Sequence, residues 1–378
     1  MPSHAPTGSV SSLLMLLVTA AAADGQAQLG SRTHTYYIAA DEVTWDYTPS
    51  GRNEIAGRPF DDVERPFVEA GAHSIGRVAL KARYREYTDS TFATLKPRPA
   101  AWEHLGLLGP VLRAEVGDTI RVVFKNNTRF PVSMHPHGLL YAKASEGAGY
   151  ADSAAAPDKE GVPTSGVHVY VWPVPERAGP GKNDPSSILW MYHSHVHEEQ
   201  DISSGLMGPI IVSARGSAKP DGMPRDVDRE FVVAFAEIDE NASRYLPVNL
   251  KMYAKDAAGA HIEPVFAVPQ VVPSDDAQFN FKETINGFTY GNGPVFTMHL
   301  GERVRWYLMS ATGFEIHSPH WHGNTVEVQG SRTDVVGLLP MGMVVADMVP
   351  DNPGIWLLHC HVSNHLRMGM QARYQVLP

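Results

Sequence analysis

The chain has 378 residues and a formal net charge of −10. This acidic balance argues against a nucleic-acid binder, because no basic face is available to release phosphate counterions. The length suits two domains of ordinary size, and the 43% hydrophobic fraction supplies material for two cores.

The N-terminus carries an apolar run from Ser11 to Ala23, followed by polar residues. The run is too short for a stop-transfer helix, and small residues at Ala21, Ala23 and Ala27 suit a signal peptidase. We therefore expect residues 1–27 to be a signal peptide and the protein to be secreted or periplasmic. A misassigned start is the alternative, since the leader has no Lys or Arg. No later segment is predicted to span a membrane.

Residues 28–215 are predicted to form a first, all-β domain. Short runs rich in β-branched and aromatic residues, such as Ile120 to Phe124 and Pro209 to Val212, are bounded by turn formers. Two His-x-His pairs lie in this domain, at positions 135/137 and 193/195. Side chains two apart on a strand share a face, so each pair presents two imidazoles side by side. Helical turns are expected only after His195 and, later, after His361.

Residues 216–228 are rich in Gly, Pro, Lys and Asp and are predicted to be a linker to a second all-β domain, 229–378. The two domains repeat one pattern. Gly109-Pro110-Val111 returns as Gly293-Pro294-Val295, and Leu189 to Val196 matches Ile355 to Val362. Two copies of one fold explain these matches.

The second domain contains His320/His322, His359/His361 and the chain's only cysteine, Cys360. A single cysteine forms no internal disulfide, and its histidine neighbours favour a metal ligand. One His-x-His pair is weak evidence, but four at matched places indicate a metal site. Cys360, with His365 and Met370 downstream, is typical of a blue-copper ligand set. On a strand Cys360 points away from its two neighbours, so it links two metal sites.

These motifs, together with Lys143 to Gly147, Asp201 to Leu206 and Asn352 to His361, resemble those of multicopper oxidases, particularly the ceruloplasmin and hephaestin branch. The resemblance implies two cupredoxin-like Greek-key β-sandwich domains. It also implies four coppers per functional unit: a type 1 copper held by His317, Cys360, His365 and Met370, a type 2 copper by His135 and His320, and two type 3 coppers by His137, His193, His361 and by His195, His322, His359.

The implied reaction couples one-electron oxidation of a small reducing substrate or metal ion, at type 1 copper, to four-electron reduction of dioxygen to water. Asp152 is the candidate proton donor, with a loop-capping role as the alternative. Ser194 and Leu206 stand where the first domain would need its own sulfur ligands. Because the motifs are split between the repeats, the resemblance implies a homotrimer with clusters at subunit boundaries. A monomer with an internal cluster is the alternative.

The electron donor is the open point. The family's ferroxidase positions fall on Gln278, Glu283 and Asn364, so only one carboxylate is retained. This favours a laccase-like enzyme acting on phenols or aromatic amines, with Glu283 kept as a candidate catalytic residue. The alternatives are a ferroxidase or cuprous oxidase of the ceruloplasmin type and, further away, a copper nitrite reductase or a non-enzymatic copper-binding protein.

Overall fold

The computed structural model describes residues 31–151, 160–256, 258–261, 274–311 and 315–378. The predicted leader, residues 1–27, and the acid candidate Asp152 lie outside these described residues. Within the described ranges, no helix combines the length and apolar character needed to span a bilayer.

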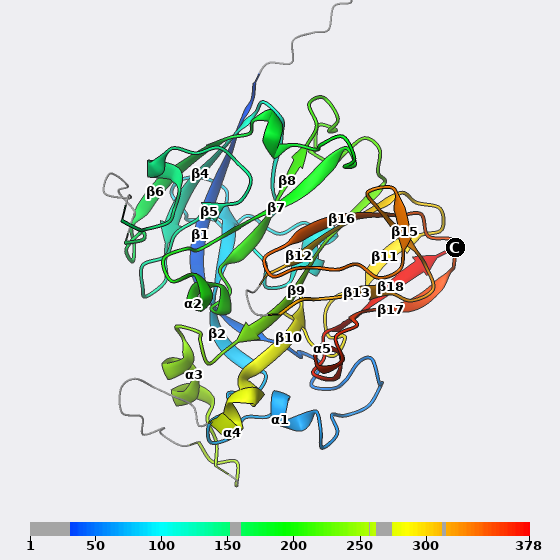
Figure 1. The fold of residues 1–378 in the computed structure, drawn as a ribbon. Coiled ribbons are helices and arrows are strands. Elements are labelled where there is room, and N and C mark those ends of the chain that lie inside the picture. The colour runs from blue at the N-terminus through cyan, green and yellow to red at the C-terminus, as the bar shows by residue number, and fades with distance from the viewer. Residues whose placement is uncertain (1–30, 152–159, 257, 262–273, 312–314) are drawn as a thin grey trace, which may run out of the picture. The chain divides into compact units, whose positions relative to one another are not determined.

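The first half of the chain forms two four-stranded sheets (Figure 1). Alternating residues such as those of Thr119–Asn126 bury one face of a sheet. The first sheet has the order β2 (Val78–Tyr87), β1 (Thr33–Asp46), β4 (Thr119–Asn126), β6 (Val167–Pro173). The second has the order β3 (Leu112–Glu115), β8 (Met207–Ser213), β7 (Ser187–His193), β5 (His135–Pro136). Both sheets contribute to one core that includes Phe124, Trp172 and Tyr192.

The second half repeats this arrangement with one six-stranded and one four-stranded sheet. The larger has the order β10 (Phe281–Ile285), β9 (Arg229–Asp239), β12 (Val304–Ser310), β16 (Met343–Met348), β14 (Val326–Val328), β15 (Ser331–Thr333). The smaller has the order β11 (Phe296–His299), β18 (Gln371–Leu377), β17 (Gly354–Cys360), β13 (Pro319–Trp321). Their shared core includes Trp306 and Trp321, and also Cys360 and Met370.

The strand pairings confirm the predicted all-β repeat. The parallel pairs β1/β4 and β3/β8 of the first half correspond to β9/β12 and β11/β18 of the second. The two halves are therefore cupredoxin-type sandwiches. Residues 216–228 run from β8 to β9 without a helix or strand of their own. The boundaries 28–215, 216–228 and 229–378 remain predictions.

Short helices occupy the connections of the described chain. They are α1 (Arg65–Val68), α2 (Glu198–Ser203), α3 (Leu246–Tyr253), α4 (Ser274–Ala277) and α5 (Ser363–Arg367), with 3-10 turns η1 (Ala100–Leu105), η2 (Lys143–Ser145), η3 (Glu176–Ala178) and η4 (Gln278–Asn280). As expected from the sequence, α2 and α5 follow the histidine pairs at the ends of β7 and β17. The other helices and 3-10 turns lie where the sequence predicted none, so that part of the prediction is wrong. The turns α2 and α5 place the residues after each pair beside the candidate metal ligands.

A separate buried cluster joins the strands of the two halves. It combines Met191 and Ile211 of β7 and β8 with Val232 and Tyr307 of β9 and β12. Nδ2 of Asn286 donates to the carbonyls of His104 (2.7 Å) and Val232 (2.9 Å). The joint is thus both apolar and specifically hydrogen-bonded.

Candidate metal centre

His317, Cys360 and His365 meet in the core of the second sandwich. Cys360 ends β17 and His365 lies in α5, while His317 precedes β13. The Nδ1 atoms of the two histidines are 3.2 Å apart, and Sγ of Cys360 is 3.5 Å from Nδ1 of His365. One ligand atom from each residue lies within 4.8 Å of the others, and all three residues are buried. This is the predicted type 1 ligand set, assembled in space.

Met370 borders the same group and is fully buried. Its backbone N–H donates to the carbonyl of His365 (2.9 Å), and its own carbonyl accepts from Cys360 N–H (3.2 Å). The backbone N–H of Ser318 donates to Sγ of Cys360 (3.3 Å). These bonds fix the thiol and the candidate axial methionine on one hydrogen-bonded frame.

The electrostatics of this group favour a bound cation. Burial raises the pKa of the Cys360 thiol, while burial and the neighbouring His365 lower the pKa of His317 to about 3. The neutral imidazole of His317 and a thiol that needs a cation to ionise are donors suited to a soft metal. The residues therefore fit a His2Cys copper site with a methionine at its edge.

The four histidines of the first half form a quartet. His135 and His193 are direct partners across β5 and β7. Nε2 of His137 lies 3.0 Å from Nε2 of His193, and the rings of His135 and His195 are 5.1 Å apart. The first quartet can therefore direct several ring nitrogens at one space.

The second quartet repeats this geometry. His320 and His359 are partners across β13 and β17, and Nε2 of His322 lies 3.1 Å from Nε2 of His359. The rings of His320 and His361 are 4.9 Å apart. The pairs 137/193 and 322/359 are those that the resemblance assigns to separate type 3 coppers.

Equivalent backbone contacts orient the rings in both quartets. Nδ1 of His135 contacts the Glu146 carbonyl at 2.6 Å, and Nδ1 of His320 contacts the Asp334 carbonyl at 2.9 Å. His193 and His359 each direct Nδ1 at the carbonyl of the next residue, at 3.0 and 2.8 Å. Such a contact fixes the tautomer and leaves Nε2 for a metal.

Burial keeps several of these imidazoles in their neutral, metal-binding form. Burial first, and then the neighbouring histidines, lower the pKa of His137 and of His359 to about 4. The pKa of His193 is also lowered by burial, well below its ordinary value. Neutral imidazole is the form that coordinates metals.

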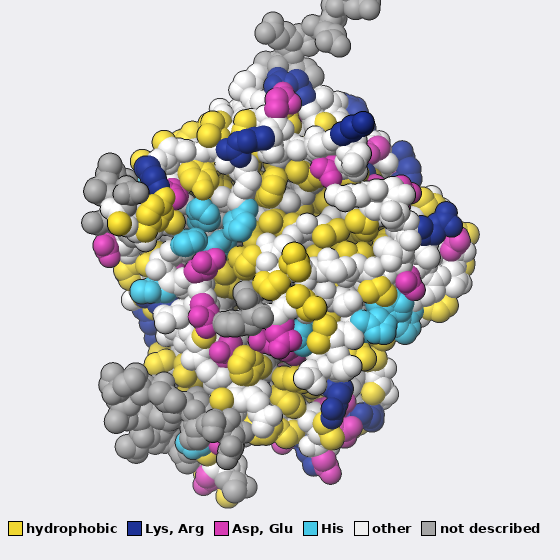
Figure 2. Space-filling model, in the orientation of Figure 1, with side chains coloured by type: hydrophobic (Ala, Val, Ile, Leu, Met, Phe, Trp, Pro, Cys, Tyr) yellow, Lys and Arg dark blue, Asp and Glu magenta, His cyan; other side chains and the backbone are white. Residues whose placement is uncertain are grey.

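The two quartets lie apart in this chain. In Figure 2 histidines gather in one place over β5 and β7 and in another over β13 and β17, with hydrophobic surface between them. Among the described residues, each ring contact between two of the eight histidines joins members of the same quartet, and no candidate metal group mixes the quartets. His322 and His361 of the second quartet are exposed.

Sequence reasoning missed a set of carboxylates beside the thiol centre. Glu237 of β9 and Glu283 of β10 are direct cross-strand partners. Oε2 of Glu315 lies 2.9 Å from Nε2 of His365. Glu237, Glu315 and His365 each offer a ligand atom within 4.8 Å of the others. A glutamate inside the apolar run of β9 was the sequence signal that could have revealed Glu237.

These carboxylates line a pocket of about 380 Å³ that also includes Gln278 and Asn364. Glu283 is 2% exposed, and its Oε2 is buried without a hydrogen-bond partner among the described residues. Burial, then the charge of Glu237, raises the pKa of Glu283, and burial also raises that of Glu237. Crowded, buried carboxyls of this kind accommodate a hard cation. Glu199 and Asp239 line the same pocket, so four glutamates and one aspartate lie here, where the sequence predicted only Glu283.

The fold and these residues define a class of protein. The chain belongs to the multicopper oxidase family: two models described as multicopper oxidase match residues 87–217 and 265–378. Solved structures agree on the fold. A structure titled "Crystal structure of multicopper oxidase" has a TM-score of 0.56 at 16% identity, covering 91% of this chain and 89% of that one. The blue copper oxidase of Nitrosomonas europaea has a TM-score of 0.53 at 16% identity, covering 92% and 86%.

Named relatives place the chain beside the ceruloplasmin and hephaestin branch. It is 41% identical over 357 residues to the ferroxidase HEPHL1 of Mus musculus, covering 92% of this chain and 30% of the relative. It is 39% identical over 351 residues to hephaestin of Rattus norvegicus (90% and 29%) and 38% identical over 362 residues to ceruloplasmin of Homo sapiens (92% and 33%). The chain thus spans about a third of the length of these relatives.

Proposed function

We propose that this protein oxidises ferrous iron and passes the electrons to dioxygen, which is reduced to water. Copper is the resident cofactor: when bound, it accepts single electrons at the His2Cys site and reduces dioxygen at the histidine quartets. In this proposal His317, Cys360, His365 and Met370 hold the type 1 copper, and the eight quartet histidines hold the other three. Four coppers per functional unit remain part of the proposal.

The contact between Glu315 and His365 is the observation that favours ferrous iron as the electron donor. Nδ1 of His365 faces Cys360 (3.5 Å), whereas Nε2 of the same ring faces Oε2 of Glu315 (2.9 Å). One imidazole therefore separates the thiol centre from a carboxylate pocket. Ferrous iron is a cation that carboxylate and imidazole ligands suit. Glu237 and Glu283 supply further oxygens, so a bound ion would lie one side chain away from the type 1 ligands.

The chain's own residues provide the connection inward. Cys360 points into the thiol centre, and its neighbours His359 and His361 belong to the second quartet. Nδ1 of His359 contacts the carbonyl of Cys360 at 2.8 Å, which locks this histidine to the cysteine backbone. A few covalent bonds thus join the site of electron entry to the site of oxygen chemistry.

This proposal reverses the order of donors predicted from the sequence. The laccase-like prediction depended on counting one carboxylate, and the folded chain brings four glutamates together in this pocket. The similarity to ferroxidase HEPHL1 also favours the ferroxidase alternative. Oxidation of phenols or aromatic amines is kept as the second candidate function.

We also propose that a complete oxygen site forms between copies of the chain. The separation of the quartets supports contact between the first quartet of one copy and the second of another. Head-to-tail contacts of this heterologous kind close into rings, and a homotrimer with three shared sites is the proposed assembly. Asp152 stays the candidate proton donor to that site. Secretion or a periplasmic location fits this protein and is likewise proposed.

Steady-state oxygen uptake tests the donor. We expect the copper-loaded protein to show a higher kcat/KM with ferrous iron than with cuprous ion or a phenol under the same conditions. Iron autoxidation is subtracted with the heat-inactivated protein. Preference for the phenol would overturn the ferroxidase proposal while leaving the multicopper oxidase family intact.

A further inference from the structure

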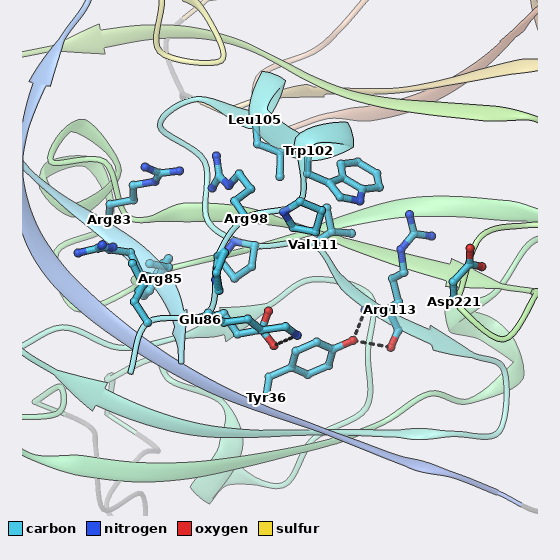
Figure 3. A pocket seen from close by; sticks show the side chains of 16 residues that line it. Tyr36, Arg83, Arg85, Glu86, Arg98, Trp102, Leu105, Val111, Arg113 and Asp221 are labelled. Carbon is cyan, nitrogen blue, oxygen red and sulfur yellow. Dashed lines mark hydrogen bonds and ion pairs between the residues drawn. The ribbon is translucent and has the colours of Figure 1, made fainter. Parts of the chain in front are cut away.

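A second pocket, lined by cations, lies in the first half of the chain. It has a volume of about 360 Å³ and is bordered by β2, the segment 95–99, η1 and β3 (Figure 3). No histidine, cysteine or methionine lines it among the described residues, so it is not a copper site. Five basic side chains border it: Arg83, Arg85, Lys96, Arg98 and Arg113.

Three of these cations have acidic partners. Lys96 pairs with Glu86 at 2.8 Å, and Arg113 pairs with Glu230 at 2.7 Å. Arg85 lies 3.5 Å from Asp41. Their charges are compensated by the fold itself, so they do not require a ligand.

Arg83 and Arg98 differ from the other three. No ion pair involves either residue in the part of the chain that the structure describes, and Nε of Arg83 is buried without a hydrogen-bond partner. Asp41 is the cross-strand neighbour of Arg83, but it instead accepts from Tyr87 (2.9 Å) and Asn127 (2.7 Å). The pocket therefore contains two cations that the fold leaves uncompensated.

The surroundings hold these two guanidinium groups in place. Arg98 donates to the carbonyls of Gly106 (3.0 Å) and Leu108 (2.5 Å). Arg83 lies over the Trp45 ring, 5.9 Å from its centroid. In Figure 3 the ends of Arg83 and Arg98 face one another. Arg98 is thus anchored by backbone, and Arg83 is positioned beside it by an aromatic ring.

The proximity is energetically unfavourable without an anion. Burial, then the charge of Arg98, lowers the pKa of Arg83 to about 9, and burial lowers the pKa of Arg98 to about 10. Both groups are still protonated at neutral pH. Buried charges of the same sign are tolerated where an opposite charge joins them.

We propose that this pocket binds a small organic anion through one carboxylate or phosphate group held between Arg83 and Arg98. The planar guanidinium fork matches the oxygens of either group. Trp102, Leu105 and Val111 line the same pocket and supply an apolar wall for the body of the ligand. A volume near the lower end of ligand pockets suits a molecule of metabolite size. The site is separate from the proposed oxidase function.

Calorimetric titration of the copper-loaded full chain tests the proposal. The probes are benzoate and phenyl phosphate, with inorganic phosphate as the head group alone and benzyl alcohol as the body alone. We expect one molecule of organic anion to bind each chain. Its affinity should be at least tenfold higher than that of inorganic phosphate or of benzyl alcohol. The tighter of the two organic anions identifies the preferred head group. Equal binding of inorganic phosphate and phenyl phosphate, or no binding of either organic anion, would overturn the proposal.

Substitutions at two positions in the same pocket separate this site from anion binding at copper. Arg83→Gln removes an uncompensated cation and is expected to weaken binding at least tenfold. Lys96→Gln removes a cation that Glu86 already compensates and is expected to leave affinity within about twofold of the original. Arg83→Lys keeps the charge without the fork, provides a second variant if Arg83→Gln is unstable, and is also expected to bind more weakly. Unchanged affinity in the Arg83 variants would place the anion elsewhere and contradict the proposal.

Discussion

Ser194 and Cys360 occupy the same position in the two halves and show how one scaffold becomes either structural or metal-binding. The backbone N–H of Ser194 donates to the Leu206 carbonyl, and that of Cys360 donates to the Met370 carbonyl, both at 3.2 Å. The side chains of Ser194 and Cys360 also accept from equivalent backbone N–H groups, at 3.0 and 3.3 Å. The hydrogen bonds around Ser194 and Cys360 are therefore equivalent.

The difference lies in what completes each frame. Oγ of Ser194 donates to Asp201 (2.6 Å), and Asp201 in turn pairs with Arg244 (3.1 Å). Cys360 instead faces His365, with His317 beside it. In the first half, Ser194 is hydrogen-bonded within a polar network. In the second half, the thiol and the imidazoles at the same place are donors that suit a bound cation. The two halves share this backbone arrangement, so the proposed type 1 copper site depends on the side chains that complete it.

Replacing the sulfur has the largest expected effect. Cys360→Ser should abolish donor-dependent oxygen uptake, remove the intense absorption near roughly 600 nm expected of a His2Cys copper site, and lower the copper content by one per chain. Ser318→Ala keeps the backbone N–H that contacts Sγ and should retain all three properties. Undiminished turnover in copper-loaded Cys360→Ser would contradict the role of the thiolate.

The polar network of the first half is predicted to matter for stability and not for electron entry. Asp201 is fully buried, so Asp201→Ala leaves Ser194 and Arg244 without their partner. Breaking such a buried pair should lower the free energy of unfolding by about 3 to 5 kcal/mol in urea titrations. Asp228→Asn, at an exposed pair with Arg303, is the control and should change little. Equal effects of the two substitutions would mean that the network is not structural.

The joint between the halves should respond to pH through His104. This residue is buried, accepts from the backbone N–H of Val232 (3.2 Å), and has a pKa lowered by burial to about 4. The unfolded chain takes up a proton near pH 6.5 and the folded chain does not, so stability falls as the pH drops from about 6.5 to about 4. The loss due to this group is about 3 kcal/mol.

Unfolding measured across this pH range in His104→Gln checks the assignment. The variant should lose about that much less stability than the original protein between pH 6.5 and 4. Parallel pH profiles for the two proteins would show that His104 is not responsible. Below about pH 4 the contribution of this group levels off, since both states then carry the proton.

The carboxylate pocket beside His365 is expected to give a smaller, donor-specific effect. Glu283→Gln removes a carboxyl group that can ionise against a bound cation and should lower kcat/KM for ferrous iron about tenfold, or about 1.4 kcal/mol, with phenol oxidation nearly unchanged. Asp228→Asn is a suitable control here too, because its exposed pair with Arg303 lies outside the carboxylate pocket. Equal losses with iron and phenol would indicate damage to the type 1 site rather than loss of an iron ligand.

The sequence predicted the parts of the site that follow from strand periodicity. His-x-His spacing places two imidazoles on one face of a strand. The repeat shows that Ser194 occupies the position in the first half that Cys360 occupies in the second. Glu237 and Glu315 escaped prediction because their proximity depends on the β9/β10 register and on the chain path before His317. The spacing of residues along the sequence does not reveal which residues become neighbours across two strands. Counting carboxylates only at positions 278, 283 and 364 therefore favoured the laccase-like donor, an order that the proposed function reverses.

Co-expression of two inactive variants is the most direct test of whether the first quartet of one chain forms an oxygen site with the second quartet of another copy. One variant carries His135→Ala and His137→Ala, and the other carries His320→Ala and His322→Ala. Each alone should be inactive. Co-expressed in equal amounts, they should recover about one quarter of the original oxygen uptake, because one in four random head-to-tail contacts joins two intact quartets. No recovery in assemblies shown to contain both variants would contradict a shared site.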